Sequence, residues 1–424
     1  MKDNCPHIPK VRFPGFKNPW QQFKVGDFID FYPTNTLSWE QLQYGINGIK
    51  NIHYGLIHTY LPTLVDIRKC TLPSILQNQL PHKYKLCKKG DIVLTDASED
   101  IDGIAKCVEL INLGGQNIIC GLHTIHGRDN KHITSVGFKG YLFNAEIFRS
   151  QIRKSTQGIK VFSISNKTIA AFNISIPCTQ EQMKIVKCLA SIDKLIEQQR
   201  KELEALKQHK QALMQQLFPQ RSQDTPALRF LNTRKGWKYE ELKKITSHCT
   251  KKNTKEEETI VLTNSAQYGV IRQQDYFDRD IVTSSNLKNY YIVEVGDFVY
   301  NPRISIAAPV GPVSKNNLVR GIISPLYLVF RFNDDNNDFY VYYFQSIHWQ
   351  MQLKKIANSG ARFDRMSIST TEFFDIKVPN LSKTESVKIA SLLCSLDRLI
   401  NCQQAKYDLL VKHKKGLMQQ LFPS

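Results

Sequence analysis

The chain has 424 residues, and 42% of them are hydrophobic, which is enough to build cores in two or three domains. Lysine and arginine number 57 against 38 aspartate and glutamate residues, and the net charge of +19 favours a polyanionic partner such as nucleic acid. No apolar run reaches the roughly 18 residues of a membrane span, and the opening MKDNCPHIPKVRFPGF lacks the apolar core of a signal peptide. The ten cysteines are scattered without a C-x-x-C pair, so we expect reduced thiols and a cytoplasmic protein.

The first predicted region, residues 10–178, is globular. Short apolar or alternating segments such as Gly90-Asp-Ile-Val-Leu-Thr95 are bounded by Gly, Asn and Asp, a pattern typical of strands. We therefore expect an α+β domain with substantial strand content.

A long helix is predicted to follow over residues 179–219. Thr179-x-x-Gln182 is a candidate capping box, and Pro219 ends the segment. Between them, residues three and four apart form a coiled-coil seam of more than four heptads, interrupted by Gln and Lys: Ile185, Leu189, Ile192, Ile196, Gln199, Leu203, Leu206, Lys210, Leu213 and Leu217. As one helix, this segment would span roughly 58 Å.

The second half of the chain follows the same plan. The polar residues 220–227 form a predicted linker, and residues 228–380 form a second predicted α+β domain. A second helix begins near the candidate capping box Ser382-x-x-Glu385 and ends before Pro423, with the same seam: Ile389, Leu393, Leu396, Ile400, Gln403, Tyr407, Leu410, Lys414, Leu417 and Leu421.

These parallels indicate a duplication of one domain-and-helix unit. Residues 208–219 (QHKQALMQQLFP) match residues 412–423 (KHKKGLMQQLFP) at an offset of 204, the difference between His413 and His209. Upstream of the helices the matches predict an offset of 202, and hence two extra residues before the second helix: Phe172–Pro177 with Phe374–Pro379, Gly158 with Gly360, and Ser165 with Ser367. Earlier matches are Lys89–Val93 with Val295–Val299 and, at an offset of 217, Val11-Arg-Phe13 with Leu228-Arg-Phe230 and Trp20 with Trp237. The middles of the units differ, so we expect one scaffold carrying two different surfaces.

The two helices are predicted to pair antiparallel. A parallel, in-register pair would place Lys210 opposite Lys414, which is repulsive. An antiparallel pair instead brings each lysine near an apolar position, where the stem packs and the ammonium group reaches water. The alternative is that each helix packs on its own globular domain.

Loops in both domains mix basic, aromatic and amide groups, the side chains that contact DNA bases and phosphates. The alternative for any one of them is an ordinary loop or fold residue. The candidate DNA-binding residues are Lys50, Tyr54, Gly55, His58, Thr59, His123, His126, Arg128 and Lys154 in the first unit, and Asn264, Ser265, Tyr268, Arg272, Tyr300, Asn301, Arg303, Ser359, Arg362 and Arg365 in the second.

No catalytic motif is present in the sequence. The chain has no G-x-x-x-x-G-K-[ST] loop, and Asn301-Pro-Arg-Ile304 lacks the second proline and the aromatic residue of the methyltransferase loop Asn-Pro-Pro-aromatic. Cys120, His123, His126 and His132 lie close together in sequence, but no second ligand pair with zinc-finger spacing accompanies them. We therefore predict neither catalytic residues nor a metal site.

With its order of variable domain, long helix, variable domain and long helix, the chain resembles the specificity (S) subunit of type I restriction-modification enzymes. The resemblance covers essentially the whole chain and rests also on Val11-Arg-Phe-Pro-Gly-Phe16, the Gly-Asp segments and the LMQQLFP helix ends. It implies a first target-recognition domain, a spacer helix, a linker with a second target-recognition domain, and a second spacer helix, over residues 1–178, 179–219, 220–381 and 382–424. It further implies an antiparallel coiled coil between the helices.

The same resemblance implies the partners. They are double-stranded DNA with a split target, two methyltransferase (M) subunits, and restriction (R) subunits that translocate DNA and cut it. S-adenosylmethionine, ATP and Mg are then expected on those subunits and none on this chain.

Two other functions would explain part of the sequence. A non-specific basic architectural protein that binds DNA or RNA would account for the charge and the duplication. A free-standing enzyme acting on DNA would need a catalytic motif, which the sequence lacks.

Overall fold

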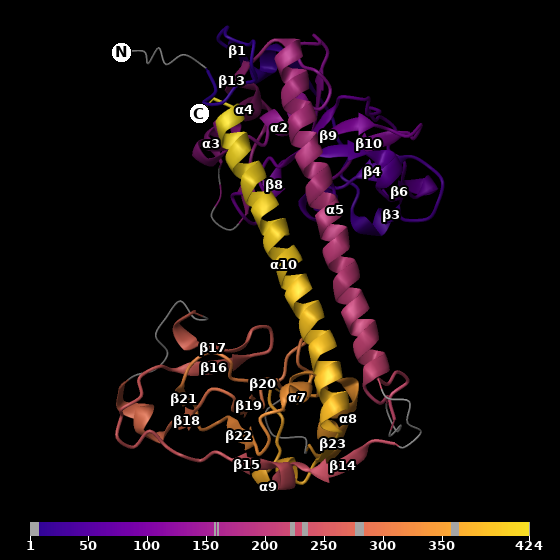
Figure 1. Cartoon of the computed structure of the whole chain (residues 1–424). Helices are drawn as coiled ribbons and strands as arrows, with labels where there is room; N and C mark the ends of the chain where they lie inside the picture. Colours follow the sequence, from indigo (N-terminus) through magenta and orange to yellow (C-terminus); the bar gives the residue numbers. More distant parts are fainter. Residues whose placement is uncertain are drawn as a thin grey trace. The chain divides into compact units, whose positions relative to one another are not determined.

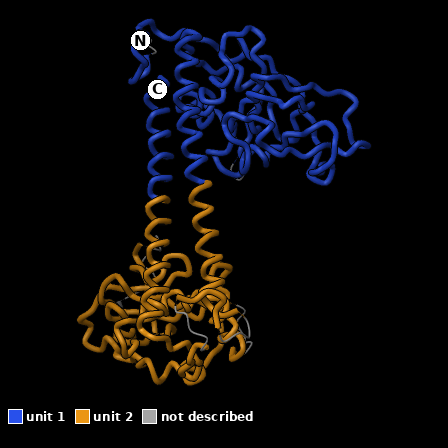
Figure 2. The backbone as a smooth tube through the Cα atoms, turned by 45° about the vertical axis from the view of Figure 1, so that its right-hand side comes forward, with its two compact units in different colours: residues 1–200, 405–424 blue, residues 201–404 orange. Residues whose placement is uncertain are grey.

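The computed structural model describes residues 8–156, 158, 161–220, 225–230, 236–275, 284–357 and 364–423, with residues 284–286 described by their backbone alone. The chain divides into two compact units, residues 1–200 with 405–424 and residues 201–404 (Figure 2). Each unit holds one globular region and one stretch of each long helix. Within the described ranges, no helix combines the length and the apolar character needed to cross a membrane.

The globular part of the first unit is built on a five-stranded sheet. Its strand order is β2 (Ile29–Tyr32), β11 (Thr124–Asp129), β7 (Ile92–Thr95), β9 (Cys107–Asn112) and β5 (Leu64–Asp66), antiparallel except for the pair of β5 and β9. A second sheet has the order β10 (Ile118–Cys120), β4 (Lys50–Ile52), β6 (Ser74–Ile75) and β3 (Leu42–Gln43). The helices of this part are α1 (Tyr54–Thr59), α2 (Phe138–Leu142), α3 (Glu146–Ser155) and α4 (Asn166–Ala170), and the last three are labelled in Figure 1.

The globular part of the second unit has a smaller main sheet. Its order is β15 (Thr246–His248), β22 (Leu328–Phe332), β19 (Phe298–Tyr300) and β20 (Val313–Lys315). Two antiparallel pairs accompany it, β16 (Leu262–Ser265) with β17 (Gly269–Arg272) and β18 (Tyr291–Val293) with β21 (Gly321–Ile323). Its helices are α6 (Leu242–Ile245), α7 (Asp338–Tyr343), α8 (Ile347–Ile356) and α9 (Thr370–Phe374). The predicted α+β class is confirmed for both parts.

A two-stranded ribbon joins the opening of each globular part to its end. Strand β1 (Gln21–Lys24) pairs with β13 (Asn173–Ile176), and β14 (Lys238–Glu241) pairs with β23 (Lys377–Asn380). Gln21 faces Ile176 and Lys238 faces Asn380, so the equivalent residues of β13 and β23 differ by 204 (380 minus 176).

The predicted offset of 202 in this region is therefore wrong. Phe172 corresponds to Ile376, since their carbonyl oxygens accept the equivalent hydrogen bonds from Val25 and Leu242. Ser165 corresponds to Ser369, because each is the N-cap of the helix that precedes the closing strand. The extra residues of the second copy thus lie earlier, between α8 and α9. The predicted match of Gly158 with Gly360 involves a residue outside the described ranges.

The long helices are α5 (Thr179–Leu217) and α10 (Lys383–Leu421), each of 39 residues. Ser382 precedes α10, and its hydroxyl accepts a hydrogen bond from the Glu385 amide at 3.3 Å. Thr179 is already the first residue of α5, so the predicted capping box at Thr179 is wrong. Gln182 instead donates its side-chain amide to Ile133 and Pro177 carbonyl oxygens.

Stretches of the two helices run antiparallel within each unit. In the first unit, Ile185 and Leu189 share a core with Leu417 and Leu421, and Asp193 pairs further along with Lys414. As the residue numbers rise along α5, those of the contacting residues in α10 fall, as in an antiparallel pair. In the second unit, Lys210 pairs with Asp397, and Leu217 shares a core with Ile389 and Leu393. The predicted antiparallel pairing is confirmed in this form.

The interaction predicted for the two seam lysines is wrong, because each meets a carboxylate and an aromatic ring. Lys414 Nζ lies 2.5 Å from Asp193 Oδ1 and 5.5 Å from the centre of the Tyr141 ring. Lys210 Nζ lies 2.6 Å from Asp397 Oδ1 and 5.4 Å from the Tyr342 ring. Burial, and then the neighbouring aspartate, raise the pKa of each tyrosine, so both rings remain neutral phenols.

In each unit, one ion pair fixes the opening segment to the start of the helix that follows the globular part. Arg12 donates to Glu181 through Nε at 2.8 Å and a terminal nitrogen at 2.6 Å, and Arg229 makes the same two bonds to Glu385. Beside these pairs, the backbone amide of Val11 donates to Gln420, and that of Leu228 donates to Gln216. The duplicated Arg-Phe openings therefore have the same structural role.

The LFP ends of the helices complete the two cores. Phe422, at the end of α10, packs edge-on against Trp20 at 6.0 Å in the first unit. Phe218, at the end of α5, packs against Trp237 at 6.4 Å in the second unit. Each globular part is thus closed by the end of the helix that starts from the other globular part.

Replacing Arg12 by Met should lower the free energy of unfolding by about 3 kcal/mol, because it leaves a buried carboxylate without its partner. Glu181 has only 2% of its side chain exposed. Urea unfolding followed by circular dichroism measures the change, and Arg12→Met with Glu181→Gln should recover part of it. Arg68→Met is the control, because Arg68 is 64% exposed in its pair with Asp66. Equal unfolding midpoints for the Arg12 and Arg68 variants would refute this role.

Candidate nucleic-acid interface

A β-bridge brings two predicted arginines together in the second unit. Arg303 and Arg365 are bridge partners, with flanking hydrogen bonds from Ile304 to Asp364 and from Met366 to Pro302. These loops are far apart in sequence, so the sequence alone did not place the two side chains together. The predicted residues Ser359 and Arg362 lie outside the described ranges.

The carboxylate of Asp364 does not form a short ion pair with either arginine. Its closest contacts are 3.8 Å to Arg303 and 3.9 Å to Arg365, beyond hydrogen-bond length. The Arg303 side chain is 62% exposed and that of Arg365 is 29% exposed. Two guanidinium groups therefore stand at one place on the surface, where the counter-charge they share among the described residues is the distant Asp364, an arrangement suited to an anion or a base edge.

Besides Asn264, the β16–β17 hairpin carries three more candidates. The Ser265 hydroxyl accepts hydrogen bonds from the amides of Gln267 and Tyr268 and so forms the turn. Tyr268 is 61% exposed at this turn, and Arg272 is exposed at the end of β17. The exposed tyrosine at the turn can stack on a base, and the exposed arginine at the far end of β17 can offer charge to a phosphate.

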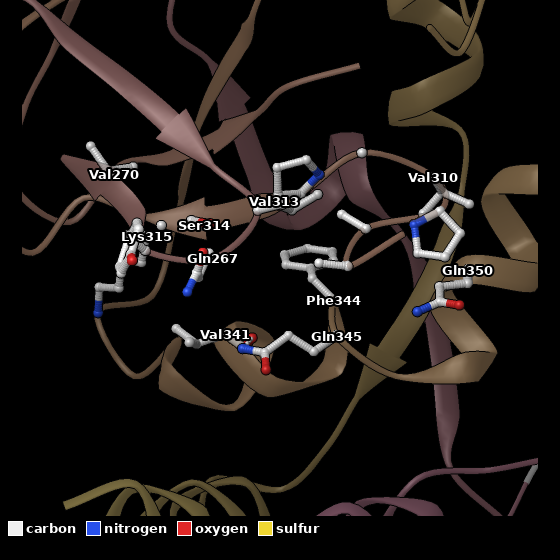
Figure 3. Close-up of a pocket in the computed structure, with 18 of the residues that line it drawn as sticks. Gln267, Val270, Val310, Val313, Ser314, Lys315, Val341, Phe344, Gln345 and Gln350 are labelled. Carbon is white, nitrogen blue, oxygen red and sulfur yellow. Dashed lines mark hydrogen bonds between the residues drawn. The ribbon is translucent and has the colours of Figure 1, made fainter. Parts of the chain in front are cut away.

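A groove of about 580 Å³ lies beside this hairpin (Figure 3). Gln267, Ser314 and Lys315 line it together with Gln345 of the segment after α7 and Gln350 of α8. Among the described residues that line this groove there is no Asp, Glu, His or Cys. Its polar groups can donate and accept hydrogen bonds, and among its described lining residues no carboxylate, imidazole or thiol accompanies Ser314 and Lys315.

Three candidates of the second unit are buried and hold the fold. Asn264 donates to the carbonyl oxygens of Val299 and Pro312, and Asn301 donates to that of Asn264. The Tyr300 hydroxyl donates to the Val310 carbonyl. These groups position the loops that bear Arg303 and the hairpin, and their own polar atoms point inward.

In the first unit, candidates from separate segments form one aromatic and imidazole cluster. Tyr54 lies 4.6 Å from His53, 5.9 Å from His58 and 5.3 Å from His123, measured between ring centres. His53 caps α1 by accepting from Gly55, and Thr59 closes the same helix by donating to the Gly55 carbonyl. Burial, and then His123, lower the pKa of His53 and favour a neutral ring.

Trp39 belongs to this cluster, although it was not predicted. Its ring lies 4.5 Å from that of His53, and the residue is 44% exposed. It stands in a polar segment distant from the other members in sequence, and only the tertiary fold joins them. His123 lies 3.1 Å from Asp96, has a positive φ of 53°, and meets the Tyr54 ring edge-on.

The two lysine candidates have different surroundings. Lys50 is half-buried and donates to Ser74 Oγ at 2.7 Å and to the Ile46 carbonyl at 3.1 Å, which ties β4 to its neighbours. Lys154 is exposed in the last turn of α3. Of the two, Lys154 has the environment of a phosphate contact.

His126 and Arg128 are buried on β11 and bind Asp91. His126 Nε2 lies 2.6 Å from the carboxylate, and Arg128 donates to it twice at 2.7 Å. Burial opposes ionisation of Asp91, but the hydrogen bonds from Arg128 and His126 outweigh it and lower the pKa of Asp91. In the second unit the corresponding pair is Asp297 with Arg331, at 2.6 Å. The Asp–Arg contact in each unit explains why the Gly-Asp segment is repeated. In the first unit, His126 and Arg128 both bind Asp91 and so have a structural role.

The comparisons with known proteins agree with this architecture. The protein-family model described as the type I restriction modification DNA specificity domain matches residues 72–208. The chain is 22% identical over 302 residues to the type I restriction enzyme MjaVIII specificity subunit of Methanocaldococcus jannaschii, covering 66% of this chain and 68% of that protein.

Two solved structures share the fold over nearly the whole chain. The S subunit of a type I restriction-modification system from M. genitalium has a TM-score of 0.56 at 13% identity, covering 98% of this chain and 99% of that one. A chain from a type I R-M system, from work on complex assembly and conformational transition, has a TM-score of 0.56 at 15% identity, covering 96% and 99%.

These matches are all to one class of protein, the DNA specificity subunits of type I restriction-modification systems, over residues 72–208 by the family model and over nearly the whole chain by the fold. Within that class, the resemblance to the specificity subunit that was stated from the sequence is confirmed.

Replacing Asn264 by Ala should lower the free energy of unfolding by about 2 kcal/mol, because the carbonyl groups of Val299 and Pro312 each lose a hydrogen bond inside the fold. Thermal unfolding measures the change. Arg272→Ala is the control on the same hairpin, and its unfolding should match that of the wild type because the residue is exposed. An Asn264→Ala protein as stable as the control would contradict the structural role and return Asn264 to the list of candidate DNA contacts.

Proposed function

We propose that this chain recognises a bipartite double-stranded DNA target, with one half-site for each globular part. The observation that carries the proposal is a duplicated framework with different exposed groups. Both units contain the Arg–Glu pair, the Trp–Phe contact and the Asp–Arg pair. The candidates at or near the surface differ, with an aromatic and imidazole cluster in the first unit and paired arginines in the second. Different groups on similar scaffolds favour two different half-sites.

The partners follow from the same proposal. We expect the paired helices to set the spacing between the half-sites and to dock two M subunits, to which R subunits are added. S-adenosylmethionine, ATP and Mg would be bound by those subunits in the cytoplasm. The net charge of +19 supports DNA binding but by itself fits a non-specific architectural protein equally well.

Selection from a random DNA pool separates the two functions. The chain assembled with its M subunits should enrich two unlike blocks of specified bases around an unspecified spacer. Enrichment of no sequence, with affinity that depends on salt alone, would favour the architectural alternative.

Lengthening both helices should lengthen the spacer. One heptad inserted after Arg200 and another after Gln404, which are equivalent positions on α5 and α10, keeps the phase of the seam. Seven residues add roughly 10 Å at 1.5 Å each, which corresponds to about three base pairs. The selected spacer should grow by that amount while both half-sites remain.

The matched control lengthens the chain without lengthening a helix, by inserting seven Gly and Ser residues after Gln220. The spacer should then be unchanged. Altered half-sites in the heptad variant, or a longer spacer in the control, would show that the helices do not set the spacing.

Replacing Arg303 or Arg365 by Ala should weaken binding through the second half-site. An arginine that contacts guanine contributes about 1–3 kcal/mol of discrimination at one base pair. An arginine that contacts phosphate weakens binding to all sequences and lowers the salt slope by about one. Binding of cognate, mismatched and random DNA at several salt concentrations distinguishes these cases.

Arg320→Ala is the control for these variants, because Arg320 is a 48% exposed arginine of the same unit that faces Glu258 and Glu294, each at 3.5 Å. It should bind DNA like the wild type. Unchanged binding by the Arg303 and Arg365 variants would remove both residues from the site. A change confined to the first half-site would contradict the assignment of one half-site to each unit.

A further inference from the structure

Two thiols and an imidazole meet inside the first unit. The sulfur atoms of Cys87 and Cys120 lie 3.5 Å apart. One potential ligand atom from each of Cys87, Cys120 and His126 lies within 4.8 Å of the other two. All three residues are buried, with exposed fractions of 5%, 2% and 0%.

The structure brings these residues together from three segments. Cys87 precedes β7 and donates its backbone amide to Ile118, Cys120 ends β10, and His126 lies in β11. The sequence pointed to Cys120, His123, His126 and His132 as a weak metal candidate and then against it. His123 and His132 are not members of this cluster, and Cys87 lies too far away in sequence to have been grouped with it.

One nitrogen of the imidazole is engaged by a carboxylate, and the other is left for a ligand bond. Its Nε2 lies 2.6 Å from Asp91 Oδ2, so the ring donates its proton there, and Arg128 holds the same carboxylate. This leaves Nδ1 with a lone pair, and Nδ1 is buried without a hydrogen-bond partner. A carboxylate behind a histidine is the usual support of a metal-bound imidazole, and a buried nitrogen without a partner is otherwise costly.

The second unit provides an internal comparison. Arg128 and Arg331 are equivalent, at a difference of 203, and the Gly-Asp segments are equivalent at a difference of 206. By these offsets the places of Cys87, Cys120 and His126 are taken by Val293, Ile323 and Val329, which pack together in one apolar core. The scaffold and its Asp–Arg pair therefore form without thiols or imidazole, and folding alone does not explain the three polar groups of the first unit.

We propose that Cys87, Cys120 and His126 bind a zinc ion. Zinc takes cysteine sulfur at about 2.3 Å and histidine nitrogen at about 2.0 Å in a tetrahedron, which sets two sulfurs roughly 3.8 Å apart. The 3.5 Å separation is close to that value.

Charge also favours this ion. Two thiolates and a neutral imidazole balance a divalent cation, so the occupied site adds no net charge to the apolar core that contains both cysteines. Sulfur ligands disfavour magnesium and calcium. Binding releases the thiol protons to solvent. Among the described residues three supply ligands, and a water molecule would complete the tetrahedron.

The metal would cross-link three segments: the residues that precede β7, the end of β10 and the middle of β11. Its role would be structural, and it would be confined to the first unit. This site is independent of the proposed function, because a chain that does not recognise a split target could still bind the ion.

Metal content and cobalt spectroscopy of the full chain test the site. Elemental mass spectrometry should find one zinc ion per molecule in the chain purified under reducing conditions without chelator. After removal of the metal, Co²⁺ should give the sulfur-to-metal charge-transfer bands and the strong visible bands of a tetrahedral site. No bound zinc together with no such spectrum from the wild-type chain would overturn the proposal.

The second unit supplies the variant. Cys87→Val with Cys120→Ile and His126→Val installs its own residues, and zinc content and the cobalt spectrum should fall at least tenfold. Cys107→Val, a buried cysteine of β9 outside the cluster, is the control and should retain both. A folded triple variant that still binds metal would refute the assignment.

Two further outcomes are decisive. A wild-type mass lower by two hydrogens, restored by dithiothreitol and accompanied by no metal, would show that the thiols form a disulfide instead. If the triple variant does not fold, the wild-type cobalt spectrum decides alone, since the chain without such bands has no thiolate-bound metal.

Discussion

The fold depends on the insertion of each helix end into a core that its own globular part does not form. Phe422 of α10 meets Trp20, and Phe218 of α5 meets Trp237. At both places an arginine of the opening segment holds the glutamate at the start of the other helix. Apolar burial brings the helix end in, and the ion pair fixes the helix start, so neither globular part is complete without both helices.

The repeated sequence predicted this framework because the contacts themselves are duplicated. The openings, the Gly-Asp segments, the seams and the helix ends each have an evident role in both units. The offset of 202 failed for a physical reason. Side chains of a strand alternate between faces, so a shift of two residues keeps the apolar pattern while mispairing Phe172 with Phe374. Only the hydrogen bonds across the ribbon distinguish the two alignments.

Long-range pairing limited the other predictions. The antiparallel direction of the helices followed from the seam, but the partner of each lysine depends on the register between helices, which places Asp397 beside Lys210. In the candidate interface, Arg303 and Arg365 were found from their loop composition. Trp39 and Cys87 were missed because folding alone brings them to their neighbours. Buried candidates such as Asn264 have the same residue types as surface ones, so composition could not separate them.

The hydrogen bonds from Val11 to Gln420 and from Leu228 to Gln216 have a topological consequence. Leu228 contacts the end of α5, and the short linker after α5 joins the two covalently. Val11 makes the equivalent contact with the end of α10, but no linker joins these two segments. The framework is therefore cyclic in its connectivity. A circular permutant that joins residue 423 to residue 11 through a short polar linker and is opened within residues 220–227 would retain every contact that closes the two cores. The fold therefore requires these contacts, but it does not require one particular order of the two halves along the chain.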